Sequence, residues 1–190
     1  MTQSFARRDG RVLFVAASPS ATSKSTFAAG VLAAELRAKG AETQHFSLRD
    51  FDAADVLLAQ MTGPRIADFV DAAKQASAIV LSTPVYKASY SGALKALVDL
   101  IPPDALAGKP ALGVATARVA AHSDDVHRAF EALFRFFQGR PLETLFVLDS
   151  EVSLGTPGGL GAPAEARARD AARQLQSALD APVAMPRPRC

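Results

Sequence analysis

Three apolar runs of strand length stand out along the chain. They cover residues 11–17 (RVLFVAA), 78–81 (AIVL) and 110–116 (PALGVAT). Such runs are typical of parallel strands that are buried on both faces of a sheet. Two weaker segments, residues 41–48 and 142–148, predict a peripheral second strand and a fifth strand. The pattern therefore predicts five strands.

Apolar positions at helical spacing separate these strands. One example is the stripe Phe27, Val31, Leu32 and Leu36, which Gly40 closes. Another begins after Ser91, a predicted N-cap, and ends at Pro102-Pro103. The predicted helices cover about residues 25–39, 64–76, 91–101, 122–137 and 164–179, whereas 49–63 and 149–163 are expected to be irregular.

Strands that alternate with helices predict a doubly wound α/β fold with a parallel sheet. Polar loops follow the strands that end near Ala17, Leu81 and Ala115. If the strand order is 2-1-3-4-5, these three strands are neighbours and their loops meet at one edge, where ligands bind in such folds.

The first of these loops, SPSATSKST at residues 18–26, has hydroxyl side chains on both sides of Lys24. It leads into a helix N-terminus, whose free N–H groups and dipole favour a phosphate. A loop that only caps its own helix is an equally good interpretation of this segment alone. Neither a Walker loop nor a Gly-x-Gly-x-x-Gly loop is present.

The second loop joins the strand at 78–81 to the helix after Ser91. It contains Ser82, Thr83 and Pro84, and the only two tyrosines of the chain, Tyr86 and Tyr90. Ser82 and Thr83 supply hydroxyls, and Pro84 ends the strand ladder because it has no N–H. In an open α/β sheet such a loop lies at the edge where ligands bind. The third loop covers residues 116–121.

The length of the chain indicates how many domains it has, and its charge indicates which kinds of partner it can bind. The 190 residues predict one domain over 11–180, with a disordered leader at 1–10 and a loose tail at 181–190. The net charge of +2 lies within residues 165–190, so the remaining body is neutral. A neutral body without a basic stripe argues against nucleic acid as a partner.

Other classes are excluded by what the chain lacks. No apolar run approaches the roughly 18 residues that a membrane span needs, and no secretory signal follows the first arginines, so a cytoplasmic location is expected. Cys190 is the only cysteine, which excludes a disulfide framework and a thiolate metal cluster. Neither His45 nor the aspartates at 50, 52 and 55 belong to a metal-binding pattern, so no metal is expected.

The segment STPVYKASYSGALKALVDLIP, residues 82–102, closely resembles the second flavin loop of the NAD(P)H-dependent FMN reductases, in particular the branch that serves alkanesulfonate monooxygenases. The loop at 18–26 is similar to that family's phosphate loop, and the likeness extends over residues 11–150. This resemblance implies a flavodoxin-like three-layer sandwich. It also implies reduction of FMN by NADPH or NADH, in a homodimer or homotetramer that supplies a flavin-dependent monooxygenase.

The resemblance also assigns the binding residues. The ribityl phosphate would be held by Ser18, Ser20, Ser23, Lys24, Ser25 and Thr26. The flavin ring would lie between Pro84, Val85, Tyr86 and Lys87 on one side and Thr116, Ala117 and Arg118 on the other. No catalytic acid or base is expected, because the cofactors carry the hydride chemistry. Lys87 or Arg118 would offer positive charge to the reduced ring, or either is simply a solvated cation.

Two departures from the family pattern stand in this chain. Ala117-Arg118 replaces the family's usual Gly-Gly, where glycine lets the backbone approach the ring closely. His127-Arg128 stands where the sulfonate branch tends to insert a tyrosine that forms a π-bulge.

Two alternative functions remain open. One is a flavoenzyme that reduces a quinone, azo compound or chromate. The other is a non-enzymatic electron carrier, which the neutral charge of the body disfavours.

Overall fold

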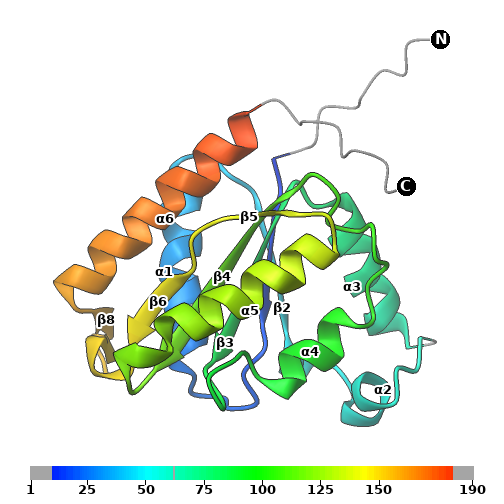
Figure 1. The fold of residues 1–190 in the computed structure, drawn as a ribbon, viewed down its shortest axis with the longest axis horizontal. Coiled ribbons are helices and arrows are strands. Elements are labelled where there is room, and N and C mark those ends of the chain that lie inside the picture. The colour runs from blue at the N-terminus through cyan, green and yellow to red at the C-terminus, as the bar shows by residue number, and fades with distance from the viewer. Residues whose placement is uncertain (1–9, 62, 182–190) are drawn as a thin grey trace.

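The computed structural model describes residues 10–61 and 63–181, and a parallel sheet forms its centre (Figure 1). Its first four strands are β1 (Val12–Ala16), β2 (Thr43–Ser47), β3 (Ala78–Pro84) and β4 (Pro110–Ala117). They lie in the order β2-β1-β3-β4, with the fifth position beside β4. The predicted order 2-1-3-4-5 is confirmed. The expected leader and tail lie almost wholly outside the described residues.

The fifth strand differs from the prediction because it is split in two. β5 (Arg140–Pro141) pairs with the start of β4, and β6 (Leu145–Leu148) pairs with its end. Between them, the N–H of Thr144 points to Nδ1 of His127 at 3.4 Å instead of to β4. The expectation of one strand over 142–148 was therefore wrong for its first three residues, since a side chain of the neighbouring helix binds that backbone group.

Helices cover both faces of the sheet, as Figure 1 shows. α1 (Lys24–Ala38) and α6 (Ala162–Asp180) pack on one face, while α3 (Pro64–Gln75), α4 (Gly92–Val98) and α5 (Ser123–Phe136) pack on the other. Successive β1 residues alternate between these two cores, which is the period of a strand. The result is the predicted three-layer α/β sandwich. Among the described residues, no helix is long and apolar enough to cross a membrane.

Two segments expected to be irregular contain short elements. A 3₁₀ turn (Leu48–Asp50) and α2 (Ala53–Leu57) lie in the first, and Asp52 caps α2 by accepting the N–H of Ala54 at 2.8 Å. The second holds a 3₁₀ turn (Asp149–Glu151) and a small hairpin of β7 (Val152–Ser153) and β8 (Gly159–Leu160). Their apolar stretches are too short to show a period, so patterning missed them.

Candidate functional site

The loops after β1, β3 and β4 lie together at the carboxyl edge of the sheet (Figure 1). Ser91 Oγ, at the start of α4, donates to the carbonyl of Ala17 at 3.1 Å, which ties the second loop to the first. The N–H of Val85 donates to the carbonyl of Thr116 at 2.8 Å, which ties the second loop to the third. The strand order thus brings together the three polar loops that the sequence analysis predicted to bind a ligand.

The first loop is organised by its own hydroxyls. Ser23 caps α1, and its Oγ accepts the N–H of Thr26 at 3.2 Å and lies 3.0 Å from Ser25 Oγ. Ser18 Oγ accepts the N–H of Ser20 at 3.3 Å. Ser18 and Ser25 are buried, whereas Ser20 and Thr26 are exposed. The first-turn N–H groups of α1 that follow the cap have no partner within the helix and are suited to an anion.

Lys24 reaches across the edge of the sheet. Its Nζ donates to the carbonyl of Asp149 at 2.7 Å, at the end of β6. An ammonium has three donors, so this bond leaves two for a further acceptor such as a phosphate. Sequence reasoning placed Lys24 in the phosphate loop but had no signal for a partner 125 residues away.

Asp149 is held in place by an ion pair behind it. Glu151 accepts the N–H of Leu148 at 2.9 Å and the guanidinium of Arg167 at 2.6 Å. The Arg167 hydrogen bond, assisted by that of Leu148 and opposed by burial, holds the pKa of Glu151 below its usual value. α6 therefore fixes the corner that presents a carbonyl to Lys24.

The second loop contains a tight two-residue turn. Tyr86 and Ser89 exchange backbone hydrogen bonds of 2.9 Å and 3.2 Å, and Lys87 and Ala88 both have positive φ, 53° and 62°. Positive φ at both central residues describes a type I′ turn, which costs non-glycine residues roughly 1–2 kcal/mol each. Such strain is kept at binding sites where the surrounding structure enforces it.

The two tyrosines occupy different environments. The side chain of Tyr86 is 51% exposed at the tip of the second loop. Tyr90 packs against Phe130 with ring centroids 5.6 Å apart, and burial raises the pKa of its phenol. Tyr86 is therefore the more exposed of the two, while Tyr90 is half-buried and packs against the core.

In the third segment, Thr116 and Ala117 are buried at the end of β4, and Arg118 is the first exposed residue after the strand. Neither residues 82–91 nor 116–121 contain His, Asp or Glu. The titratable side chains of these two segments are Tyr86, Lys87, Tyr90 and Arg118, and the absence of a catalytic acid or base stays a prediction. Among the described residues, no group of three His, Cys, Asp or Glu side chains could hold a metal.

Comparison with known proteins decides the family. The family described as "NADPH-dependent FMN reductase" matches residues 11–154, a range that contains all three loops. The chain belongs to the NADPH-dependent FMN reductase family. The resemblance found in the loops is thereby confirmed, and so are the fold class and the class of oxidoreductase that it implies.

Individual members of the family match most of the chain. An "FMN reductase (NADPH)" of Pseudomonas putida is 38% identical over 176 residues, which cover 88% of this chain and 87% of that protein. An Escherichia coli K12 protein of the same name is 36% identical over 143 residues, 75% of each chain. The crystal structure of an NADH:FMN oxidoreductase, EMOB, in its apo form has a TM-score of 0.82 at 25% identity and covers 90% of this chain and 91% of its own.

The donor set at the carboxyl edge fits the cofactor of an FMN reductase. FMN combines a dianionic phosphate with a flat ring. The start of α1 offers N–H groups, hydroxyls and the Lys24 ammonium, and the second loop offers an exposed aromatic side chain beside a rigid turn. The assignment of individual residues to the phosphate and the ring stays a prediction.

The helix in which the resemblance led us to look for an inserted tyrosine is regular in this chain. α5 runs without a π turn from Ser123 to Phe136 in the described chain. His127 Nδ1 lies 3.1 Å from Thr144 Oγ1, and Arg128 pairs with Asp125 at 2.7 Å. His127 thus joins α5 to the β5–β6 connection.

Proposed function

We propose that this protein reduces FMN with NADPH or NADH as the hydride donor. The reduced flavin would then serve a separate flavin-dependent monooxygenase of the sulfonate type. The observation that carries the proposal is the convergence of three loops, one with phosphate-binding chemistry and one with an exposed tyrosine on a strained turn. The names of the bacterial relatives describe the same reaction.

The protein's part in this reaction is to bind and to orient. The N–H groups at the start of α1, with Ser18, Ser20, Ser23, Lys24, Ser25 and Thr26, would hold the phosphate. Residues 84–87 would border the flavin ring on one side and residues 116–118 on the other. One flat face of the ring would stay open to the nicotinamide. When bound, FMN supplies the ring that accepts a hydride from the nicotinamide, with one proton taken from solvent.

A cation near the ring would stabilise the negative charge that collects there on reduction. Lys87 and Arg118 are the two candidates, and both project from the edge that the loops share. Replacing the responsible cation by alanine is expected to lower kcat while the affinity for FMN changes little. Replacing a solvated cation would leave both quantities unchanged.

The experiment that tests the function is NADPH oxidation by the purified protein with and without added FMN. Oxidation that depends on FMN supports the proposal. If NADPH is oxidised only when a quinone, azo compound or chromate is added, that compound is the electron acceptor. If the protein binds flavin but does not oxidise NADPH, it is an electron carrier.

The phosphate assignment has its own test. Lys24→Ala should weaken FMN binding about tenfold or more, because one charge-assisted hydrogen bond contributes roughly 1.5–3 kcal/mol. Adding Ser25→Ala should weaken it further. Lys39→Ala is the matched control, an exposed lysine at the opposite end of α1. Equal FMN affinity in Lys24→Ala and Lys39→Ala would refute the assigned loop.

A homodimer or homotetramer in the cytoplasm completes the proposal. Phe136, 56% exposed at the end of α5, is an apolar surface that a second subunit would cover. Sedimentation of the wild type and of Phe136→Ser would test this: a smaller assembly in the variant supports the interface, and an unchanged one removes Phe136 from it.

A further inference from the structure

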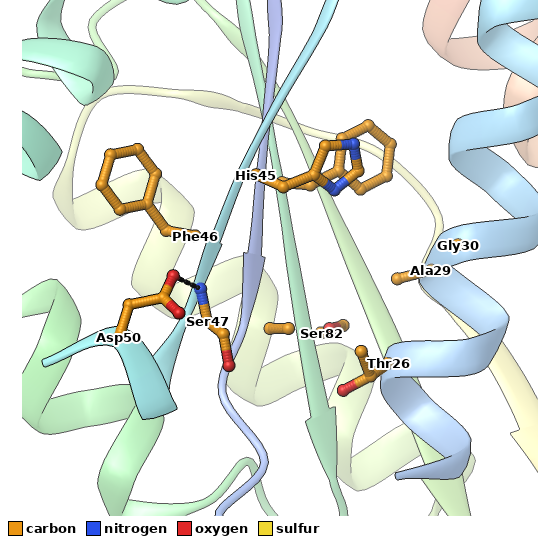
Figure 2. Close-up of a pocket in the computed structure, with 10 residues that line it drawn as sticks. Thr26, Ala29, Gly30, His45, Phe46, Ser47, Asp50 and Ser82 are labelled. Carbon is orange, nitrogen blue, oxygen red and sulfur yellow. Dashed lines mark hydrogen bonds between the residues drawn. The ribbon is translucent and has the colours of Figure 1, made fainter. Parts of the chain in front are cut away.

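A groove between α1 and the edge strand β2 borders the first two loops, because Thr26 and Ser82 belong to its lining (Figure 2). Its volume is about 250 Å³, and its lining includes Phe14, Thr26, Gly30, His45, Ser47 and Asp50. α1 packs over β1, β3 and β4, so the row of β2 side chains that faces the same way is left uncovered by a helix in the described chain. Sequence reasoning missed this site, because His45 alone gave no ligand pattern.

Two rows of side chains run along the groove in opposite directions. Thr26, Gly30 and Arg37 are spaced by four and seven residues, which places them on one stripe of α1. Thr43, His45 and Ser47 alternate along one face of β2. Figure 2 shows His45 and Ser47 across from Gly30 and Thr26.

Gly30 makes the space at the centre of the groove. It lies inside α1, where glycine costs stability relative to alanine. A Cβ added there would meet nothing within 4 Å, and its φ is not in the positive region. Neither packing nor backbone geometry therefore requires glycine at this position, which opens onto the groove.

The floor opposite Gly30 is aromatic. The rings of Phe14 and His45 stack with centroids 5.0 Å apart at an interplanar angle of 16°. A volume of about 250 Å³ lies just below the ~300–1,000 Å³ of pockets for drug-sized ligands. The groove is thus suited to one flat ring system and is too small for a whole dinucleotide.

One end of the groove carries hydrogen-bonding groups for a ring edge. Asp50 Oδ2 accepts the N–H of Ser47 at 2.8 Å and also pairs with Arg65, while its other oxygen has no partner among the described residues. The hydroxyl of Thr26 likewise makes no hydrogen bond within the described chain. A carboxylate oxygen and a hydroxyl match a ring with an exocyclic amino group and ring nitrogens.

The other end carries groups for an anion. Arg37 donates to Thr43 Oγ1 at 3.1 Å, and His45 Nε2 lies 3.1 Å from the same hydroxyl. Arg37 pairs with no carboxylate among the described residues. At about 1.5 Å rise per residue, the helix places Arg37 roughly 10 Å beyond Gly30, within reach of a phosphate that is joined to the ring through a sugar.

We propose that this groove binds the adenosine phosphate part of a nucleotide, with the amino-purine ring between Gly30 and the exposed face of His45 and the phosphate on Arg37 and Thr43. The same chemistry occurs in a free adenine nucleotide and in the adenosine end of a nicotinamide dinucleotide. The inference does not require flavin reduction, since Gly30, His45 and Arg37 lie outside the residues assigned to FMN, although the groove shares Thr26 with the phosphate loop.

The test is calorimetric titration of the full chain with 5′-AMP, both without FMN and in excess FMN, together with NMR of the His45 ring. Gly30→Leu fills the groove, and Gly30→Ala is its matched control, since both remove the glycine from the helix but only leucine occupies the space. We expect saturable binding to the wild type and Gly30→Ala, loss of binding in Gly30→Leu, and about tenfold weaker binding in Arg37→Gln.

NADPH kinetics distinguish the two sources of the ligand. A higher KM for NADPH at unchanged kcat in Gly30→Leu assigns the groove to the adenosine end of the dinucleotide. An unchanged KM with lost AMP binding assigns it to a free adenine nucleotide. Absence of saturable AMP binding to the wild type, or equal AMP affinity in Gly30→Leu and Gly30→Ala, overturns the proposal, and either result can be obtained whether or not the protein reduces FMN.

Discussion

Replacing Ser91 by alanine removes two hydrogen bonds at the junction of the first and second loops. Ser91 Oγ accepts the N–H of Leu94 at 3.1 Å as the N-cap of α4, and it donates to the carbonyl of Ala17 at 3.1 Å. Loss of an N-cap costs about 1 kcal/mol, and a buried carbonyl left without a partner costs about 1–3 kcal/mol. Ser91 is 1% exposed, so water does not reach either group easily. We expect the free energy of unfolding to fall by roughly 2–4 kcal/mol.

Urea unfolding measures this loss, and Tm should fall by roughly 4–15 °C for a chain of this size. Ser91→Thr keeps the hydroxyl and should restore most of the stability. Ser150→Ala is the control, because Ser150 is exposed and its side chain makes no hydrogen bond in the described chain. A loss below about 1 kcal/mol in Ser91→Ala, or no recovery in Ser91→Thr, would refute the argument that this hydroxyl joins the loops.

Two further predictions concern the frame of the site. In Gly113→Ala the new Cβ would lie 2.6 Å from Phe130 Cε2, and Phe130 cannot move away easily because it stacks on Phe134. We expect the free energy of unfolding to fall by about 1–3 kcal/mol. Gly159→Ala, where the new Cβ would meet nothing within 4 Å, is the control and should leave the free energy of unfolding unchanged. Because the pKa of Glu151 is lowered in the folded state, its contribution to stability is present above its ordinary pKa of 4.5 and is lost as pH falls through the folded value. The difference in unfolding free energy between wild type and Glu151→Gln should therefore be largest near neutral pH and shrink in acid, and a constant difference would contradict the role given to Arg167.

Most of the fold was readable from local patterns. The apolar runs that became β1, β3 and β4 are buried on both faces, and the predicted ends of α1, α3 and α5 agree with the structure within one residue. Caps and stripes are set by neighbours within a few residues, so a single segment contains the signal. The split of the fifth strand was not readable, because the group that takes the N–H of Thr144 is His127 on another element.

Some features of the candidate site were likewise predictable from the sequence, and others were not. The residue types of the first and second loops point to a phosphate and a ring, and the strand order implied that the loops would meet. Contacts between distant segments carried no signal: the bond of Lys24 to Asp149, that of Ser91 to Ala17, and the groove where Gly30 faces His45. Each depends on how α1 lies across the sheet, which no window of the sequence contains.

By itself, the sequence determined which segments are strands and helices, where they are capped, and which loops carry binding chemistry, because these properties depend on residues close together in the chain. Only the tertiary structure decided what those loops touch, that Lys24 bonds a carbonyl at the end of β6, and that α1 leaves β2 uncovered. The physical reason is that hydrogen-bond partners and cavities are set by the packing of the sheet and its helices, which brings together groups that lie far apart in the sequence.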